Sequence, residues 1–177
     1  YSLCSIDFDK EKGTFGNRID TLIDAEKMKK SISFPRPSYD GKYIMFTLSD
    51  YGNFSIWHKE ADLWLLNLQD GSLRTIHEVN SDNTESFHNW SSNSHWFVFS
   101  SRREDGLYTR LYLACINKEG KVSKPFLLPQ KNPMNYYDKL LYSYNVPEFT
   151  NSPVKIEPRK LEREIVSNKR VQVEVRK

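Results

Sequence analysis

Hydrophobic and polar residues alternate along several short segments of this chain, as they do in β-strands that have one buried face. In segment 42–48, Ile44 and Phe46 fall on one face of an extended strand, while Met45 falls on the other. Segment 95–101 repeats this alternation about 53 positions later. Each segment follows a short polar turn, so the pattern predicts antiparallel strands joined by tight turns.

The alternating segments belong to a longer unit that occurs more than once. Residues 63–71 (LWLLNLQDG) resemble residues 111–120 (LYLACINKEG), and both copies close on a glycine. Self-similarity at a period of roughly 40 to 50 residues is typical of blade or solenoid arrays. We predict strands at 31–34, 42–48, 62–68 and 72–77 in one unit, and at 87–89, 95–101, 108–117 and 122–128 in the next.

Four short strands per unit indicate an all-β fold built from four-stranded antiparallel blades of a β-propeller. The segment YSLCSIDFDKEKG at the start of the chain matches only the later half of the unit. We therefore expect two to three blades and interpret the chain as the C-terminal part of a longer propeller. The predicted parts are a partial blade at 1–24, blades at 31–77 and 86–128, a covering segment at 129–149 and a charged tail at 150–177.

Three segments depart from the strand pattern. Segment 23–30 lies between two units and is predicted to be a surface turn or a short helix. Segment 159–168 is predicted to be a short helix, with Pro158 in its first turn. Valines alternate with polar residues at 171–175, which favours a half-exposed strand.

The turn and the strand that follows it resemble the repeat of the TolB-like (WD40-like) β-propeller family, which reads approximately Pro-x-Trp-Ser-Pro-Asp-Gly-Lys-x-Ile-x-Phe-x-Ser-x-Arg. Pro37 stands where that repeat has Trp, and Ser94 stands where it has Gly, so we expect both turns to be weakened. The matching residues are Pro35, Pro37, Ser38, Asp40, Gly41, Lys42, Ile44 and Phe46 in one copy, and Trp90, Ser91, Asn93, Phe97, Phe99, Ser101 and Arg102 in the other.

Two stretches, IWHKEADLWLLNL and SSRREDGLYTRLY, resemble a secreted or periplasmic bacterial subgroup of this family, most of which has no assigned activity. The resemblance implies a complete propeller of six to eight blades. It also implies a place in the bacterial cell envelope, either periplasmic or secreted, with a lipid anchor at a missing N-terminus as an alternative.

Composition and charge narrow the classes of function. Hydrophobic residues make up 38% of the chain and aromatic residues 14%, which supplies enough apolar material for a core. The net charge is +3, but the segment 155–177 alone holds eight Lys or Arg and four Glu. The rest of the chain is nearly neutral, so we expect no nucleic-acid partner. No apolar run reaches the roughly 18 residues of a membrane span, and no motif indicates a cofactor.

The densest group of polar residues lies in the stretch 57–62. His58, Glu60 and Asp62 are residue types that bind metal ions, and alternate positions on an extended segment share a face. The alternative is a loop that packs Trp57 against the blade and turns its charges to water. We favour the loop.

Four further residues are candidates for contact with a ligand or a partner. His88 and Trp90 precede a strand and are candidates for lining the propeller channel, with structural hydrogen bonding as the alternative. Arg102 and Arg103 follow that strand, just before Glu104, and arginine forks pair with carboxylates. We expect such pairs to join neighbouring blades, or to bind an anionic ligand.

These observations favour a non-enzymatic scaffold that binds a protein or a small ligand at one propeller face. Trp57, His58, Trp90 and Arg102 are the preferred contacts, because aromatic and arginine residues anchor binding surfaces. The alternative is the propeller domain of a hydrolase or a metal-dependent enzyme whose catalytic part lies outside this chain. The chain has no Gly-x-Ser-x-Gly motif of a serine hydrolase. Because isolated blades leave strand edges uncovered, we also expect the chain to self-associate when it is expressed alone.

Overall fold

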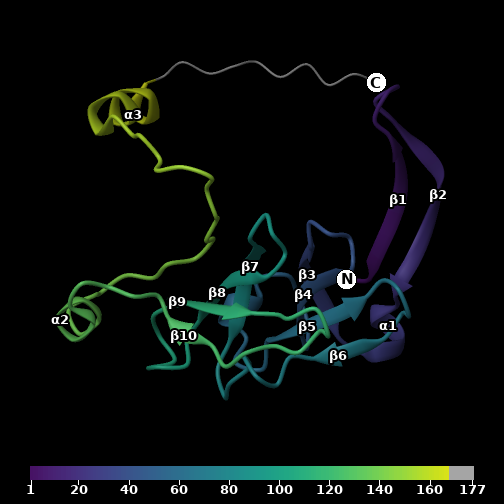
Figure 1. The fold of residues 1–177 in the computed structure, drawn as a ribbon, viewed down its shortest axis with the longest axis horizontal. Helices are drawn as coiled ribbons and strands as arrows, with labels where there is room; N and C mark the ends of the chain where they lie inside the picture. The colour runs from purple at the N-terminus through teal and green to yellow at the C-terminus, as the bar shows by residue number, and fades with distance from the viewer. Residues whose placement is uncertain (168–177) are drawn as a thin grey trace.

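The computed structural model describes residues 1–167 and shows a chain dominated by antiparallel β-sheets (Figure 1). Two sheets have four strands and one has two, and in each sheet the strands follow one another in chain order. The all-β prediction is therefore confirmed. The strands are β1 (Leu3–Asp9), β2 (Thr14–Ile23), β3 (Ser31–Pro37), β4 (Tyr43–Ser49), β5 (Asp62–Asn67), β6 (Leu73–Thr75), β7 (Glu85–Trp90), β8 (Trp96–Ser101), β9 (Arg110–Cys115) and β10 (Phe126–Leu127).

The two four-stranded sheets, which we call the first sheet (β3–β6) and the second sheet (β7–β10), are copies of one another in register. Tyr43 pairs with Asn67 across β4 and β5, and Trp96 pairs with Cys115 across β8 and β9. All six residue pairs of β4 and β5 recur at the matching positions of β8 and β9. The repeat predicted from the sequence therefore corresponds to a repeat of the backbone.

The first strand of each sheet contains the same irregularity. Phe34 in β3 has φ 53°, and Phe87 at the equivalent place in β7 has φ 47°. A positive φ is uncommon for a residue other than glycine, and each strand shifts its register at this point. The two rings lie with centroids 4.8 Å apart, so the bulges bring the first strands of the two sheets together.

The polar turns before β4 and β8 also match. Gly41 has φ 71°, and Ser94, which replaces that glycine in the second copy, has φ 58°. The hydroxyl of Ser94 accepts a hydrogen bond from the backbone N–H of Asp40 at 2.9 Å. This bond links the two turns and offsets the cost of the left-handed conformation, so the expected weakening of the second turn has a compensation that the sequence did not suggest.

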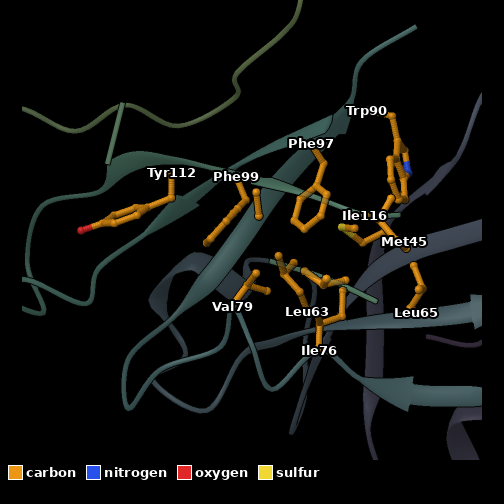
Figure 2. Close-up of a cluster of buried hydrophobic side chains, with 12 residues drawn as sticks. Met45, Leu63, Leu65, Ile76, Val79, Trp90, Phe97, Phe99, Tyr112 and Ile116 are labelled. Atoms are coloured by element: carbon orange, nitrogen blue, oxygen red, sulfur yellow. The ribbon is translucent and has the colours of Figure 1, made fainter. Parts of the chain in front are cut away.

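The main core lies between the two four-stranded sheets (Figure 2). Met45 of β4 and Leu63 of β5 face Phe97 and Phe99 of β8 across the interface. Phe46 belongs to a second cluster on the opposite face of the first sheet. The predicted division of Met45 and Phe46 between the two faces of one strand is confirmed.

The second cluster is covered by the base of the β1–β2 hairpin and by α1 (Ala25–Met28), which confirms a short helix in segment 23–30. The rest of the hairpin extends away from the body (Figure 1). Phe15 and Ile19 are each 67% exposed, and Phe8 is also exposed. The hairpin therefore presents apolar side chains that nothing in residues 1–167 covers.

The segment after β10 returns to the second sheet. It contains α2 (Pro133–Tyr137), and the backbone oxygen of Tyr144 accepts hydrogen bonds from the hydroxyls of Ser100 and Thr109. Further on, α3 (Pro158–Val166) begins at Pro158 and confirms the predicted helix. The strand predicted at 171–175 lies outside the described residues. No helix within residues 1–167 is long and apolar enough to cross a membrane.

Candidate partner-binding site

The loop between β4 and β5 is fixed to the body at several points. It contains a turn of 3-10 helix, η1 (Ser55–Trp57), whose Ser55 and Ile56 are buried. The hydroxyl of Ser55 hydrogen-bonds that of Ser86 in β7 at 2.8 Å, and Thr84 Oγ1 donates to the backbone oxygen of His58 at 2.7 Å. Because both contacts reach the second sheet, the loop has a defined position.

This anchored loop carries three aromatic side chains that face solvent. Tyr51 is 71% exposed, Phe54 is 68% exposed and Trp57 is 73% exposed. Neighbouring apolar residues held in solvent by an ordered loop are typical of an interaction site. The favoured prediction, in which the loop packs Trp57 against the blade, is wrong, because Trp57 faces solvent.

Arg102 lies beneath the exposed Trp57, and its guanidinium carbon is 4.1 Å from the centre of the indole ring. The residue is only 9% exposed, and within residues 1–167 its Nε atom is buried without a hydrogen-bond partner. Burial lowers the pKa of Arg102 from its ordinary value, and the charge of Asp105 opposes this effect. The site thus combines an exposed aromatic face with a buried cation.

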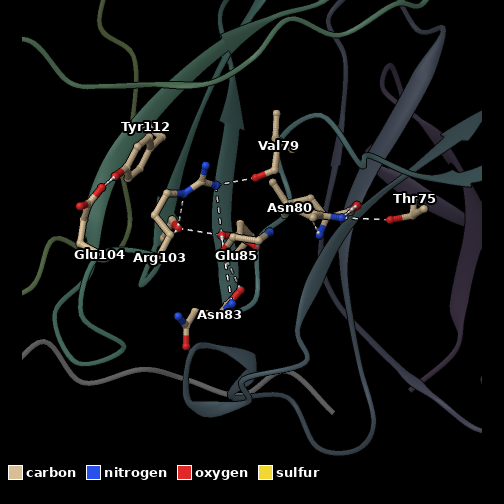
Figure 3. Close-up of polar contacts among 11 residues, drawn as sticks. Thr75, Val79, Asn80, Asn83, Glu85, Arg103, Glu104 and Tyr112 are labelled. Atoms are coloured by element: carbon tan, nitrogen blue, oxygen red, sulfur yellow. Dashed lines mark hydrogen bonds and ion pairs between the residues drawn. The ribbon is translucent and has the colours of Figure 1, made fainter.

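Arg103, the next residue, has a full set of partners (Figure 3). Its Nη2 atom lies 3.1 Å from Oε1 of Glu85 and also donates to the backbone oxygen of Val79. Glu85 is fully buried and accepts hydrogen bonds from the hydroxyls of Ser81 and Ser101. Burial raises the pKa of Glu85, and the charge of Arg103 and these hydrogen bonds oppose the rise. The carboxylate that pairs with Arg103 is in β7 of the same sheet.

The surrounding polar groups make this network rigid (Figure 3). The guanidinium of Arg103 also lies 4.4 Å from the ring centre of Tyr112, whose hydroxyl donates to Glu104. The side chain of Asn80 bonds both backbone groups of Leu63 and so continues the edge of β5. Arg103 therefore has a structural role, and it fixes the connection between the two sheets.

The three residues considered as metal ligands differ in their surroundings. His58 Nδ1 lies 3.2 Å from Oε1 of Glu60, and its ring packs edge-on against Tyr51. Asp62 is half-buried at the start of β5, and burial raises the pKa of its carboxyl group. In the part of the chain that the structure describes, no three His, Cys, Asp or Glu side chains are placed to hold a metal ion.

His88 and Trp90 lie inside the molecule. His88 Nε2 donates to the backbone oxygen of Met45 at 2.8 Å, and burial lowers the pKa of the imidazole to about 4. The indole Nε1 of Trp90 donates to the backbone oxygen of Arg36 at 3.0 Å. Both side chains have hydrogen bonds within the fold, and neither presents an open surface to a ligand.

Sequence reasoning missed a cavity of about 430 Å³ next to the β8–β9 loop. Arg110 forms one wall and is held by Asp105 at 3.8 Å and by the backbone oxygens of Leu140 and Tyr142. No local signal marks this cavity, because its walls come from segments far apart in the chain. Its lining residues are Glu104, Asp105, Tyr108, Arg110, Leu127, Pro133, Met134, Tyr137, Asp138, Leu140 and Leu141.

Comparisons with known proteins do not assign a family. No model of a known protein family matches the chain, and no curated protein matches it at a significant level. The function proposed below therefore rests on the contacts of the residues described above.

Proposed function

We propose that this chain is part of a β-propeller and serves as a non-enzymatic scaffold that binds a partner protein. Support for the propeller comes from two four-stranded antiparallel sheets that repeat the same register and bury a common core between their faces. Because the sequence resembles TolB-like repeats, we also propose that the protein acts in the bacterial periplasm or outside the cell.

The observation that carries the binding role is the anchored aromatic loop. Tyr51, Phe54 and Trp57 are exposed on a loop whose backbone is held by Ser55 and His58. Large aromatic side chains that are already ordered lose little conformational entropy on association. They are also the residue types that dominate binding energy at interfaces. This end of the two sheets is therefore our candidate binding face.

Photo-crosslinking in the native organism tests this role. A benzoylphenylalanine residue replaces Phe54 or Trp57, and the matched control replaces the exposed Lys118, which lies in the β9–β10 turn at the opposite end of the second sheet. We expect one discrete crosslinked protein from positions 54 and 57 and none from position 118. No adduct from positions 54 and 57, or the same set from all three, would refute the proposed binding face.

A further inference from the structure

We propose that Arg102 binds a carboxylate of the partner, supplied by an aspartate or glutamate side chain that lies next to an apolar residue. The inference rests on the proposed function, because it names the chemical group that the partner brings to the aromatic loop. It assigns a ligand class to a residue whose charge has no ion-pair partner within residues 1–167.

The two neighbouring arginines, Arg102 and Arg103, differ in their partners. Arg103 forms an ion pair with Glu85, donates to a backbone oxygen and lies over Tyr112. Arg102 is nine-tenths buried, yet within residues 1–167 its guanidinium joins no ion pair and its Nε has no acceptor. A buried donor without an acceptor costs free energy, and a buried cation without an anion costs more. An external carboxylate at the terminal Nη atoms, which are not buried as Nε is, would reduce the cost of the unpaired charge.

The acidic groups around the loop are already engaged. Asp105 accepts hydrogen bonds from the backbone N–H groups of Leu107 and Tyr108, both at 2.8 Å, and faces Arg110. Glu104 accepts the hydroxyl of Tyr112. Asp105 and Glu104, the two carboxylates that follow the arginines, therefore have partners of their own, and within residues 1–167 neither forms an ion pair with Arg102.

The geometry favours a carboxylate over other anions. The guanidinium carbon of Arg102 lies 4.1 Å from the centre of the indole ring of Trp57. A carboxylate pairs with a guanidinium through two parallel hydrogen bonds, which a single-point acceptor does not form. The negative charge of Asp105 acts on this position and disfavours a doubly charged phosphate more than a singly charged carboxylate. The exposed rings of Trp57 and Phe54 then accept an apolar neighbour of the acidic residue.

The first test uses the full chain labelled with ¹⁵N at arginine side chains, and acetyl-Phe-Asp-amide as the probe. We expect the aspartate peptide to move the Nε–Hε signal of Arg102 in a saturable manner. The matched acetyl-Phe-Asn-amide should bind at least tenfold more weakly, and so should inorganic phosphate. Equal shifts with the aspartate and asparagine peptides, or a stronger response to phosphate, would overturn the proposal.

The variants separate this inference from the proposed function. The variants are compared through the indole N–H signal of Trp57 in uniformly ¹⁵N-labelled protein, because R102Q and R102K lack the Arg102 signal and Trp57 lies 4.1 Å from the guanidinium. R102Q should abolish the shift of this signal by the aspartate peptide, whereas R18Q, at an exposed arginine of β2, should retain it. R102K keeps the positive charge but loses the paired N–H groups of the guanidinium, so we expect an affinity between those of the wild type and R102Q. R102K also tests the proposal if R102Q fails to fold. An undiminished crosslink from position 57 in folded R102Q would preserve the binding face and reject the carboxylate. Loss of the crosslink in R102Q but not in R18Q supports both.

Discussion

Two adjacent arginines have different roles because of what the fold places beside them. Glu85 is buried, and Arg103 supplies its positive partner, so these side chains act as one structural unit between β7 and the end of β8. Arg102 is also buried, but it has an aromatic ring above it and forms no ion pair within residues 1–167. Arg103 therefore stabilises the fold, whereas Arg102 is the residue for which we propose a binding role.

Removal of one member of the buried pair should be costly. We expect Arg103→Ala to lower the free energy of unfolding by about 3–5 kcal/mol, because Glu85 would remain buried without its cation. Urea denaturation measures this loss. The control is Arg18→Ala, which breaks an exposed pair with Asp20 and should cost about 0–1 kcal/mol. If the two variants lose the same free energy of unfolding, the buried pair stabilises the protein no more than the exposed pair does.

His88 should make the stability depend on pH. Burial lowers the pKa of His88 from 6.5 to about 4 in the folded protein. The unfolded chain takes up a proton near pH 6.5, so this contribution is complete above that pH and is lost as the pH falls toward 4. We expect a loss of about 3 kcal/mol across this window. Urea denaturation of the wild type and of His88→Gln at several pH values measures this contribution. If the free energy of unfolding depends on pH in the same way for both proteins, the prediction is wrong.

At the scale of elements, the two copies of the turn differ at one position, where Ser94 stands in place of the glycine found at position 41. Both turns need a left-handed residue, which glycine supplies without steric cost at position 41. Ser94 adopts the same conformation, and its hydroxyl binds the backbone of the other turn through Asp40 N–H. A departure from the repeat therefore creates a contact between the two copies.

This contact leads to an expectation for two substitutions at one position. Ser94→Ala retains the unfavourable backbone conformation and loses the hydrogen bond, so we expect a loss of stability of about 1–2 kcal/mol. Ser94→Gly loses the same bond but relieves the strain, and it should be close to neutral. Thermal or urea unfolding distinguishes the two, and a glycine variant as unstable as the alanine variant would disprove the compensation.

At the scale of the whole molecule, the two four-stranded sheets bury one face each against the other. The β1–β2 hairpin has no such cover within residues 1–167, and Phe8, Phe15 and Ile19 remain in solvent. Apolar surface of this kind favours association. The hairpin is therefore one apolar surface through which the chain could contact a further blade of the proposed propeller.

The isolated chain should consequently associate with itself. We expect its sedimentation coefficient to rise with protein concentration, because the exposed hairpin offers apolar side chains and strand edges. The double substitution Phe15→Ser and Ile19→Thr should reduce this dependence while leaving the four-stranded sheets intact. A monomeric wild type over the whole concentration range would rule out the expected association.

The sequence by itself determined the all-β class, the repeat, the positions of β3, β4, β5, β7, β8 and β9, and the division of Met45 and Phe46 between two faces. The strand predicted at 122–128 is reduced to β10 at Phe126–Leu127, and β2 was not predicted. These features follow from local periodicity, which reports how successive side chains are directed along a strand. Only the tertiary structure decided the surroundings of Arg102, Arg103 and Trp90. Whether a charge is paired, or a ring is exposed, depends on segments distant in the chain, such as Glu85 beside Arg103. The local pattern of hydrophobic and polar residues does not predict contacts between such distant segments.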